Sequence, residues 1–154
     1  MSVTIQDSSK GFDRLVAELK RSGEKEVVAG IQQGAQKDGL QVAEYATWNE
    51  FGTSKTPARP FMRNYFDGKR DVIERFARNG ITQVALGNAS FEQFLNAAGV
   101  HLVDGIKKSI TDGAWEPNAP YTIQKKGSAK PLIDTGTMLN SVTFAIHAYG
   151  TTKE

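Results

Sequence analysis

The sequence predicts a single domain of the α+β class, with several helices and two or three short strands. The chain has 154 residues, which is the size of one ordinary domain. Apolar residues recur at helical spacing from residue 91 to 111, and they alternate with other residues from 142 to 146, as in a strand. Because no internal repeat, low-complexity tract or linker interrupts the chain, we expect residues 1–154 to form one domain.

The first third of the chain is predicted to contain strands and helices in alternation. Residues 3–5 are compatible with a short strand, and residues 27–35 (VVAGIQQGA) are β-branched at their start and bounded by turn residues. Between them, an amphipathic helix is expected to end at Gly23. Residues 41–51 predict a short helix that Gly52 stops, because glycine adopts left-handed backbone angles most easily. The apolar positions of the first helix are Phe12, Leu15, Val16 and Leu19.

A stiff joint follows in the stretch EFGTSKTPARPFMRNYF, residues 50–66. Pro57 and Pro60 bracket Arg59, which should be extended because it precedes a proline. Pro60 suits the first position of a helix, where its missing N–H costs nothing. This helix is expected to bury Phe61, Tyr65, Val72, Ile73 and Phe76, to reach Arg78, and to end at Asn79 and Gly80.

Two interpretations of Arg59 are open at this point. In one, the joint is a tight turn between helices and the arginine is exposed. In the other, the flanking prolines hold Arg59 in one direction, where it pairs with a carboxylate, and Glu50 is the nearest candidate.

The second half of the chain begins with the most strongly patterned helix, residues 91–111. Ser90 and Gln93 form a capping-box pair before it. Residues 115–131 are rich in Pro, Gly and Lys and predict a long loop, mobile in the isolated protein, that could include one strand at 121–124. Asp134 is expected to cap a single helical turn, and the last five residues are expected to fray.

The composition excludes several classes of function. The chain has no cysteine, so no disulfide or thiolate metal site is expected, and its net charge is only +2. The two histidines, His101 and His147, have no ligand spacing around them, and no nucleophile is marked by a base. We therefore expect no enzyme activity, cofactor or metal, which disfavours a small hydrolase. We also expect no signal peptide and no bilayer-spanning run.

A nucleic-acid-binding module is the alternative hypothesis. Basic residues gather in two places, but acidic residues interrupt the first group, and a helix of mixed charge is usually a solvated face. Neither GTSK nor KKGSAK has the glycine spacing of a phosphate-binding loop. The first group is Arg59, Arg63, Lys69, Arg70, Arg75 and Arg78, interrupted by Asp67, Asp71 and Glu74; the second is Lys125, Lys126 and Lys130.

Three stretches together resemble a family of small structural proteins of tailed bacteriophages. They are AEYATWNEFGTSKTPARPFMRNYFD, GNASFEQFLNAAGVHLVDGIKKSI and GAWEPNAPYTIQKKGSAKPLIDTGTMLNSVTF, and they cover most of residues 42–146. The family comprises tail-completion, head–tail joining and virion-morphogenesis proteins, including minor tail proteins of the neck. The resemblance implies a compact α+β fold in which helices pack on a small, mainly antiparallel sheet.

The resemblance also implies a non-enzymatic assembly role at the head-proximal end of the tail. The implied partners are further copies of the chain in a ring, the tail tube or tail terminator, and the head connector; DNA would only pass through the ring, and the implied location is the virion. The implied assembly motif is Glu50, Phe51, Gly52, Pro57, Arg59, Pro60 and Phe61. The implied interaction loop is Trp115, Pro117, Asn118, Pro120, Lys125, Lys126, Gly127, Lys130, Asp134, Thr135 and Gly136, and Pro131 and Leu132 belong to the same pattern.

Overall fold

A computed structural model of the chain describes residues 9–32, 34–37 and 39–151. Within these residues, seven helices pack on a small antiparallel sheet, which confirms the predicted α+β class. The strand expected at residues 3–5 and most of the C-terminal end lie outside the described residues. The elements are α1 (Lys10–Ser22), β1 (Lys25–Ile31), β2 (Gln36–Lys37), β3 (Leu40–Gln41), α2 (Val42–Phe51), α3 (Phe61–Gly68), α4 (Arg70–Leu86), α5 (Phe91–Asp112), α6 (Pro120–Lys126), α7 (Thr137–Asn140) and β4 (Val142–Ala148).

The main sheet is formed by β1 and β4, which are antiparallel although they lie at opposite ends of the sequence. Their register places Val27 opposite Ile146, Ala29 opposite Phe144 and Ile31 opposite Val142. These pairs share one face of the sheet, because side chains alternate along a strand. The helix α5 packs against both strands.

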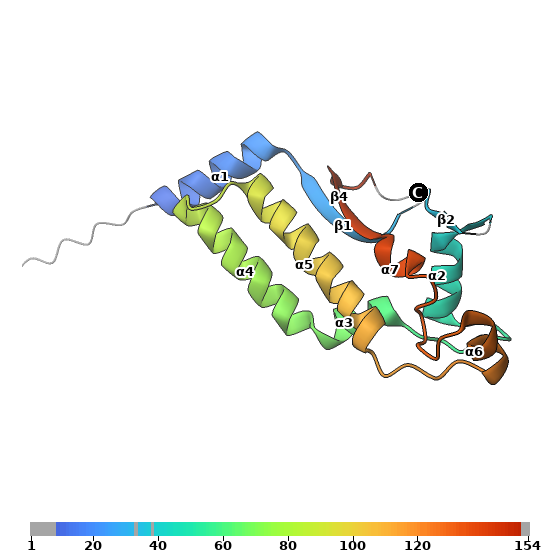
Figure 1. Ribbon diagram of the computed structural model, residues 1–154. Coiled ribbons are helices and arrows are strands. Elements are labelled where there is room, and N and C mark those ends of the chain that lie inside the picture. The colour runs from blue at the N-terminus through green and yellow to red at the C-terminus, as the bar shows by residue number, and fades with distance from the viewer. Residues whose placement is uncertain (1–8, 33, 38, 152–154) are drawn as a thin grey trace, which may run out of the picture.

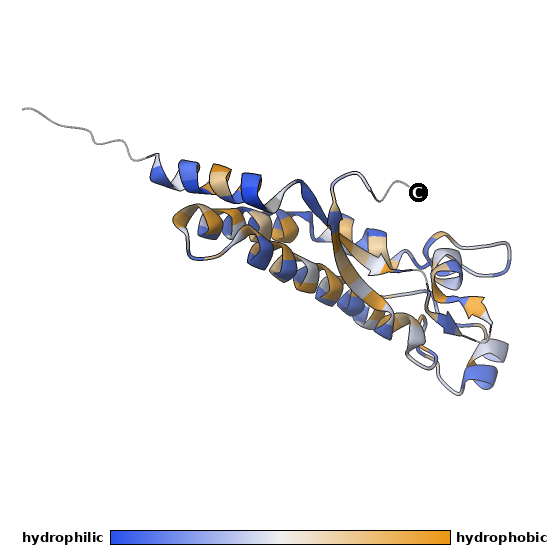
Figure 2. Ribbon diagram, turned by 90° about the horizontal axis from the view of Figure 1, so that it is seen from above, coloured by the Kyte–Doolittle hydropathy of each residue, from blue (hydrophilic) through white to orange (hydrophobic). Residues whose placement is uncertain are grey.

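The molecule is elongated (Figure 1). Helices α1, α4 and α5 lie side by side at one end, and α2, α6 and α7 lie at the other. Apolar and polar residues alternate along α4 and α5, as expected of amphipathic helices with one covered face (Figure 2). This arrangement places the loops near α2 and α6 at one end of a helical scaffold, a common position for a binding site.

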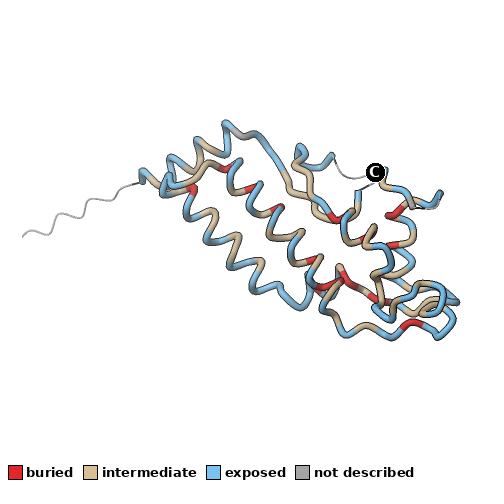
Figure 3. The backbone as a smooth tube through the Cα atoms, viewed as in Figure 1, coloured by how far each residue is buried: buried red, intermediate tan, exposed pale blue. Residues whose placement is uncertain are grey.

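The core has two parts, and α5 contributes to both. The larger part surrounds the fully buried side chains of Phe61 and Ile106, and the smaller one surrounds Val84 and Leu95. Buried positions recur along α5 and again where the chain enters α3 (Figure 3). Thus α5 connects the end of the molecule that carries α1 with the end that carries the loops.

Several elements lie where the sequence predicts them. The helix α2 ends at Gly52, which has a φ of 76°. The capping box is present: Ser90 Oγ accepts from the Gln93 N–H at 3.1 Å, and Gln93 Oε1 accepts from the Ser90 N–H at 2.8 Å. Strands β1 and β4 overlap the predicted segments, although β1 begins and ends earlier than predicted.

The single helix predicted from residue 60 to 78 is wrong. The chain forms two helices, α3 and α4, with Lys69 between them at φ −123° and ψ 19°. Asn79 and Gly80 do not end α4, which continues to Leu86 and is closed by the left-handed Gly87. Gly80 instead permits close packing, because a methyl group there would collide with the ring of Phe94 on α5. The side chain of Val72, predicted to be buried, is 43% exposed.

The predicted loop also contains an unpredicted helix. Residues 121–124 belong to α6, so the strand suggested there is wrong. The local signals are those of a short helix: Pro120 at its first position, Lys125 and Lys126 in its last turn, and Gly127 in the left-handed conformation after it. Asp134 does not cap the following turn, because α7 begins after Gly136.

The close approach of α5 to the sheet gives a stability prediction. A methyl group at Gly99 would collide with the ring of Phe144, whereas one at Gly68 would meet no heavy atom within 4 Å. We expect Gly99→Ala to lower the free energy of unfolding by about 1–3 kcal/mol, although alanine favours helix. Gly68→Ala, the control, should be neutral or stabilise by up to about 1 kcal/mol. Urea unfolding measures both, and equal stabilities would show that α5 is not packed this tightly.

Candidate functional site

Glu50 connects the end of α2 to the start of α3. Its buried carboxylate accepts hydrogen bonds from the Met62 N–H at 2.9 Å and the Arg63 N–H at 3.1 Å. The Arg63 side chain returns to the same residue, with Nε 3.1 Å from Glu50 Oε1 and Nη2 2.8 Å from the Glu50 carbonyl oxygen. Glu50 therefore satisfies two of the backbone donors that every helix start leaves unpaired. This carboxylate fixes the angle between the two helices.

Arg59 has a different set of partners from the one predicted. Its side chain does not pair with Glu50, and it is not exposed, since only 4% of the residue is accessible. Its Nε donates to the Glu116 carbonyl oxygen at 2.8 Å. Its Nη2 donates to the Pro117 carbonyl oxygen at 3.2 Å and to Asn118 Oδ1 at 3.3 Å. Arg59 is held in one direction, as one interpretation expected, but it binds a distant loop and not a nearby carboxylate.

Burial shapes the electrostatics of Arg59. Loss of solvent lowers the pKa of its guanidinium, and the negative charge of Glu116 partly opposes that effect. An arginine side chain nevertheless remains protonated in proteins. The site therefore contains a buried positive charge whose three hydrogen-bond acceptors are neutral oxygens.

The backbone of the joint explains why its residues are glycine and proline. A side chain at Gly52 would come within 2.9 Å of the Ala58 nitrogen, so only glycine allows this close approach. The Arg59 N–H donates to the Asn49 carbonyl oxygen at 2.6 Å, which returns the chain to α2. Pro60 lies one position before α3 and not within it, with φ −75° and ψ 67°.

The segment from residue 115 to 131 is anchored at several points. Asn118 is buried, and its Nδ2 donates to the Lys130 carbonyl oxygen at 3.2 Å and to the Ala129 carbonyl oxygen at 3.5 Å. Trp115 Nε1 donates to the Ser109 carbonyl oxygen at 3.1 Å. The expectation that little holds this loop in place is therefore wrong. The sequence alone does not reveal these hydrogen bonds.

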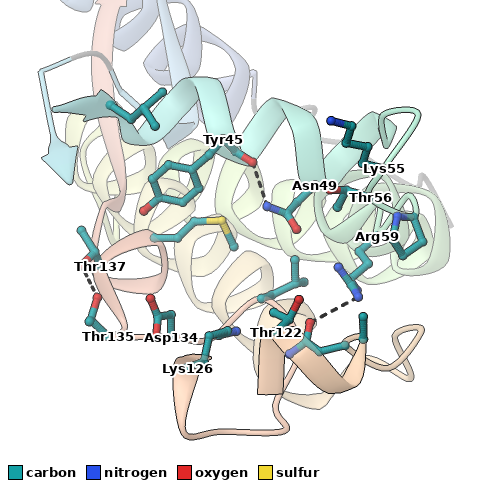
Figure 4. A pocket seen from close by; sticks show the side chains of 16 residues that line it. Tyr45, Asn49, Lys55, Thr56, Arg59, Thr122, Lys126, Asp134, Thr135 and Thr137 are labelled. Atoms are coloured by element: carbon teal, nitrogen blue, oxygen red, sulfur yellow. Dashed lines mark hydrogen bonds between the residues drawn. The ribbon is translucent and has the colours of Figure 1, made fainter. Parts of the chain in front are cut away.

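A cavity of about 420 Å³ lies where α2, the joint, α6 and the chain before α7 meet. Its charged lining residues are Lys55, Arg59, Lys126 and Asp134 (Figure 4). One wall contains Leu132, which has a φ of 61°, an uncommon value for a residue with a branched side chain. The cavity is the place where both halves of the sequence signature meet.

The sequence-predicted site residues divide into three groups. The cavity brings together Pro57, Arg59, Asn118, Lys126, Asp134 and Thr135. Other predicted residues have structural roles. They are Glu50, Gly52, Pro60, Trp115, Pro117 and Pro120, as described above, together with Phe61 in the core and the left-handed Gly127 and Gly136. Phe51 lies outside the cavity, 65% exposed, with the Arg63 guanidinium 4.9 Å from its ring centre, and Lys125 and Lys130 do not line the cavity.

Sequence reasoning missed several residues of this site. Tyr45 and Asn49 line the cavity from α2, and their spacing of four residues places them on one helix face. This spacing is a sequence signal that the two side chains share one face of α2. The lining also includes residues that nothing local in the sequence marks as part of a site: Leu40, Lys55, Thr56, Ala119, Thr122, Thr137 and Met138.

Among the residues that the structure describes, the histidines and acidic residues do not assemble into a second centre. His101 stacks on Phe76 with 4.3 Å between ring centres, and its buried Nε2 has no hydrogen-bond partner among the described residues. His147 is exposed on β4. Over the described part of the chain, no three His, Cys, Asp or Glu side chains lie close enough to hold a metal ion. None of the helices described is long and apolar enough to cross a membrane.

No protein-family model, curated protein or solved structure matches the chain.

The role of Arg59 can be tested by truncation. Arg59→Ala removes the donor of three hydrogen bonds and leaves their acceptor oxygens without this partner, so we expect the free energy of unfolding to fall by about 3 kcal/mol. Arg78 is exposed, and Arg78→Ala should change that energy by less than about 0.5 kcal/mol. Thermal melts of the two variants compare them directly. Equal melting temperatures would rule out a structural role for Arg59.

Proposed function

We propose that the protein is a non-enzymatic virion assembly protein that acts at the head-proximal end of a bacteriophage tail. In this role it completes the tail or joins it to the head as a ring of identical subunits. The observation that carries the proposal is the meeting of the two signature segments. Arg59 of the first segment binds residues 116–118 of the second, so the parts of the chain that resemble the phage proteins form one unit.

The mechanical requirements of a neck ring support this proposal. A subunit that links two large assemblies needs fixed angles between its elements, so that its binding surfaces keep their relative positions. Glu50 fixes the angle between α2 and α3, and Arg59 attaches the α6 segment to that corner. Prolines at 57 and 60 reduce the conformational entropy that folding of the joint must overcome.

Exposed apolar side chains supply surfaces for protein contacts. Phe12, Leu19 and Leu86 are exposed on α1 and at the end of α4, which pack together. Trp48 and Phe51 are exposed on α2, at the opposite end of the molecule (Figure 1). Aromatic and apolar residues are enriched in interface cores. Two such surfaces on one subunit suit heterologous contacts, which close into a ring when the rotation between subunits allows it.

The proposed partners are further copies of the chain, the tail tube or tail terminator, and the head connector. A nucleic-acid-binding module is less well supported. The basic residues of α4 alternate with acids, and Arg70 is paired with Glu74 at 3.1 Å. DNA would therefore pass the ring without a continuous basic track to hold it.

Deletion of the gene from its phage or prophage tests this function. We expect electron micrographs of the lysate to show filled heads beside separate or malformed tails, because the joint between them is missing. Infectious titre should fall by orders of magnitude and return when the wild-type gene is supplied in trans.

A variant adds a control for this experiment. Supplying Arg78→Ala should restore the titre, whereas Arg59→Ala should not, because it weakens the unit that the proposal places at the joint. Normal joined, infectious particles from the deletion strain would refute the assignment.

A further inference from the structure

We propose that the cavity between α2 and α6 binds a carboxylate side chain from an acidic segment of a partner protein. The inference depends on the proposed function only in taking the occupant to be a protein. The ligand chemistry itself follows from the charges, the lining and the shape of the cavity.

The cavity lining is mainly positively charged. Among the described residues, three cations, Lys55, Arg59 and Lys126, line the cavity, and Asp134 is the one acidic residue of that lining. Arg59 is the most deeply buried of the three cations, and the oxygens that accept its hydrogen bonds are all neutral. Buried charges in proteins are normally paired, so a carboxylate brought by a partner completes this environment. Glu116 lies near enough to raise the pKa of Arg59, but the atom that accepts from Arg59 is its backbone oxygen.

The rest of the lining suits a short peptide segment. Apolar surface comes from Leu40, Pro57 and Met138, which can contact the methylene groups and backbone next to an acidic residue. Hydroxyl groups come from Thr135 and Thr137, which share one hydrogen bond at 2.7 Å and keep further bonding capacity. The volume of about 420 Å³ lies within the roughly 300–1,000 Å³ typical of ligand pockets.

The walls of the cavity are fixed before a partner arrives. The Asn118 side chain donates to the carbonyl oxygens of residues 129 and 130, and Arg59 binds the start of the same segment. Leu132, at φ 61°, keeps its unfavourable backbone angle only because its surroundings determine it. A pre-organised cavity loses less conformational entropy on binding than a mobile loop does.

The charges favour a protein carboxylate over a nucleic acid. A polyanion would bring several phosphates past Asp134, whereas an acidic side chain brings one charge to Lys55 and Arg59. Sites for single-stranded nucleic acid combine a basic groove with aromatic side chains for stacking, and this lining contains one aromatic residue, Tyr45.

Titration of the purified full-length protein tests the proposal. The probe is a capped heptapeptide with two aspartates among leucine and alanine residues. Its binding is followed by the shifts of the protein's backbone amide signals in nuclear magnetic resonance spectra. We expect the Lys55, Thr135 and Thr137 amides to shift. The same peptide with asparagines should bind at least roughly tenfold more weakly, since the charge interaction is lost.

Two charge reversals localise the binding. Lys55→Glu places a negative charge in the cavity lining and should raise the Kd of the aspartate peptide by roughly tenfold or more. Lys125→Glu makes the same change in net charge beside the cavity but outside its lining, and should change the Kd by less than about twofold. Both residues are exposed, so both variants are expected to fold.

Three results would overturn the proposal. One is equal affinity for the aspartate and asparagine peptides, and another is equal weakening by the two charge reversals. The third is tighter binding of a seven-nucleotide oligothymidylate or of inorganic phosphate at the same amides, which would assign the cavity to phosphate. Because this measurement uses purified protein, its failure leaves the gene-deletion result unchanged, and the reverse is also true.

Discussion

The attachment of residues 116–118 to Arg59 is the interaction on which the functional end of this molecule depends. It joins positions 57 to 59 residues apart in the sequence, and the side chain that makes it is almost completely buried. Asn118 extends the connection to residues 129 and 130. The Arg59 guanidinium group and Asn118 together hold the segment that carries α6 beside α2, and the cavity lies between them.

The rest of the fold supplies a rigid base for this arrangement. The long helix α5 packs on β1 and β4 and also contacts α1, α3 and α4. Its glycines at 99 and 105 lie against the rings of Phe144 and Tyr65, where a side chain would not fit. Such packing transmits strain and resists deformation. A rigid helical scaffold that presents fixed loops is a common arrangement for binding surfaces.

The parts of the fold that the sequence predicts are those with local causes. The capping box at Ser90, the apolar stripe of α5 and the alternation in β4 depend on residues a few positions apart. The helix α4 continues through Gly80, where the missing side chain leaves room for the ring of Phe94 on α5, and no local pattern records this packing. The helix α6 had local signals, namely Pro120 and Gly127, but the surrounding loop composition outweighed them.

The sequence predicts several residues of the candidate site, but it does not predict the hydrogen bonds that join them. The sequence signature includes four residues that the cavity brings together: Arg59, Asn118, Lys126 and Asp134. The partner of Arg59 was misassigned because proximity in sequence favoured Glu50, whose carboxylate is already occupied by the start of α3 and by Arg63. Long-range hydrogen bonds of this kind require the folded chain.

Native-state hydrogen exchange of the α6 amides in wild type and in Arg59→Lys tests whether Arg59 holds α6 in place. Lysine keeps the positive charge but loses the planar set of donors that reaches three oxygens. We expect the amides of Ile123 and Gly127, which close the turns of α6, to exchange roughly a hundredfold faster, because local opening becomes easier by about 2–3 kcal/mol. The core amides of α5 should be unaffected, as should all amides in the control Arg78→Lys. Unchanged protection of α6, or an equal loss of protection in α6 and α5, would show that Arg59 does not hold α6 in place.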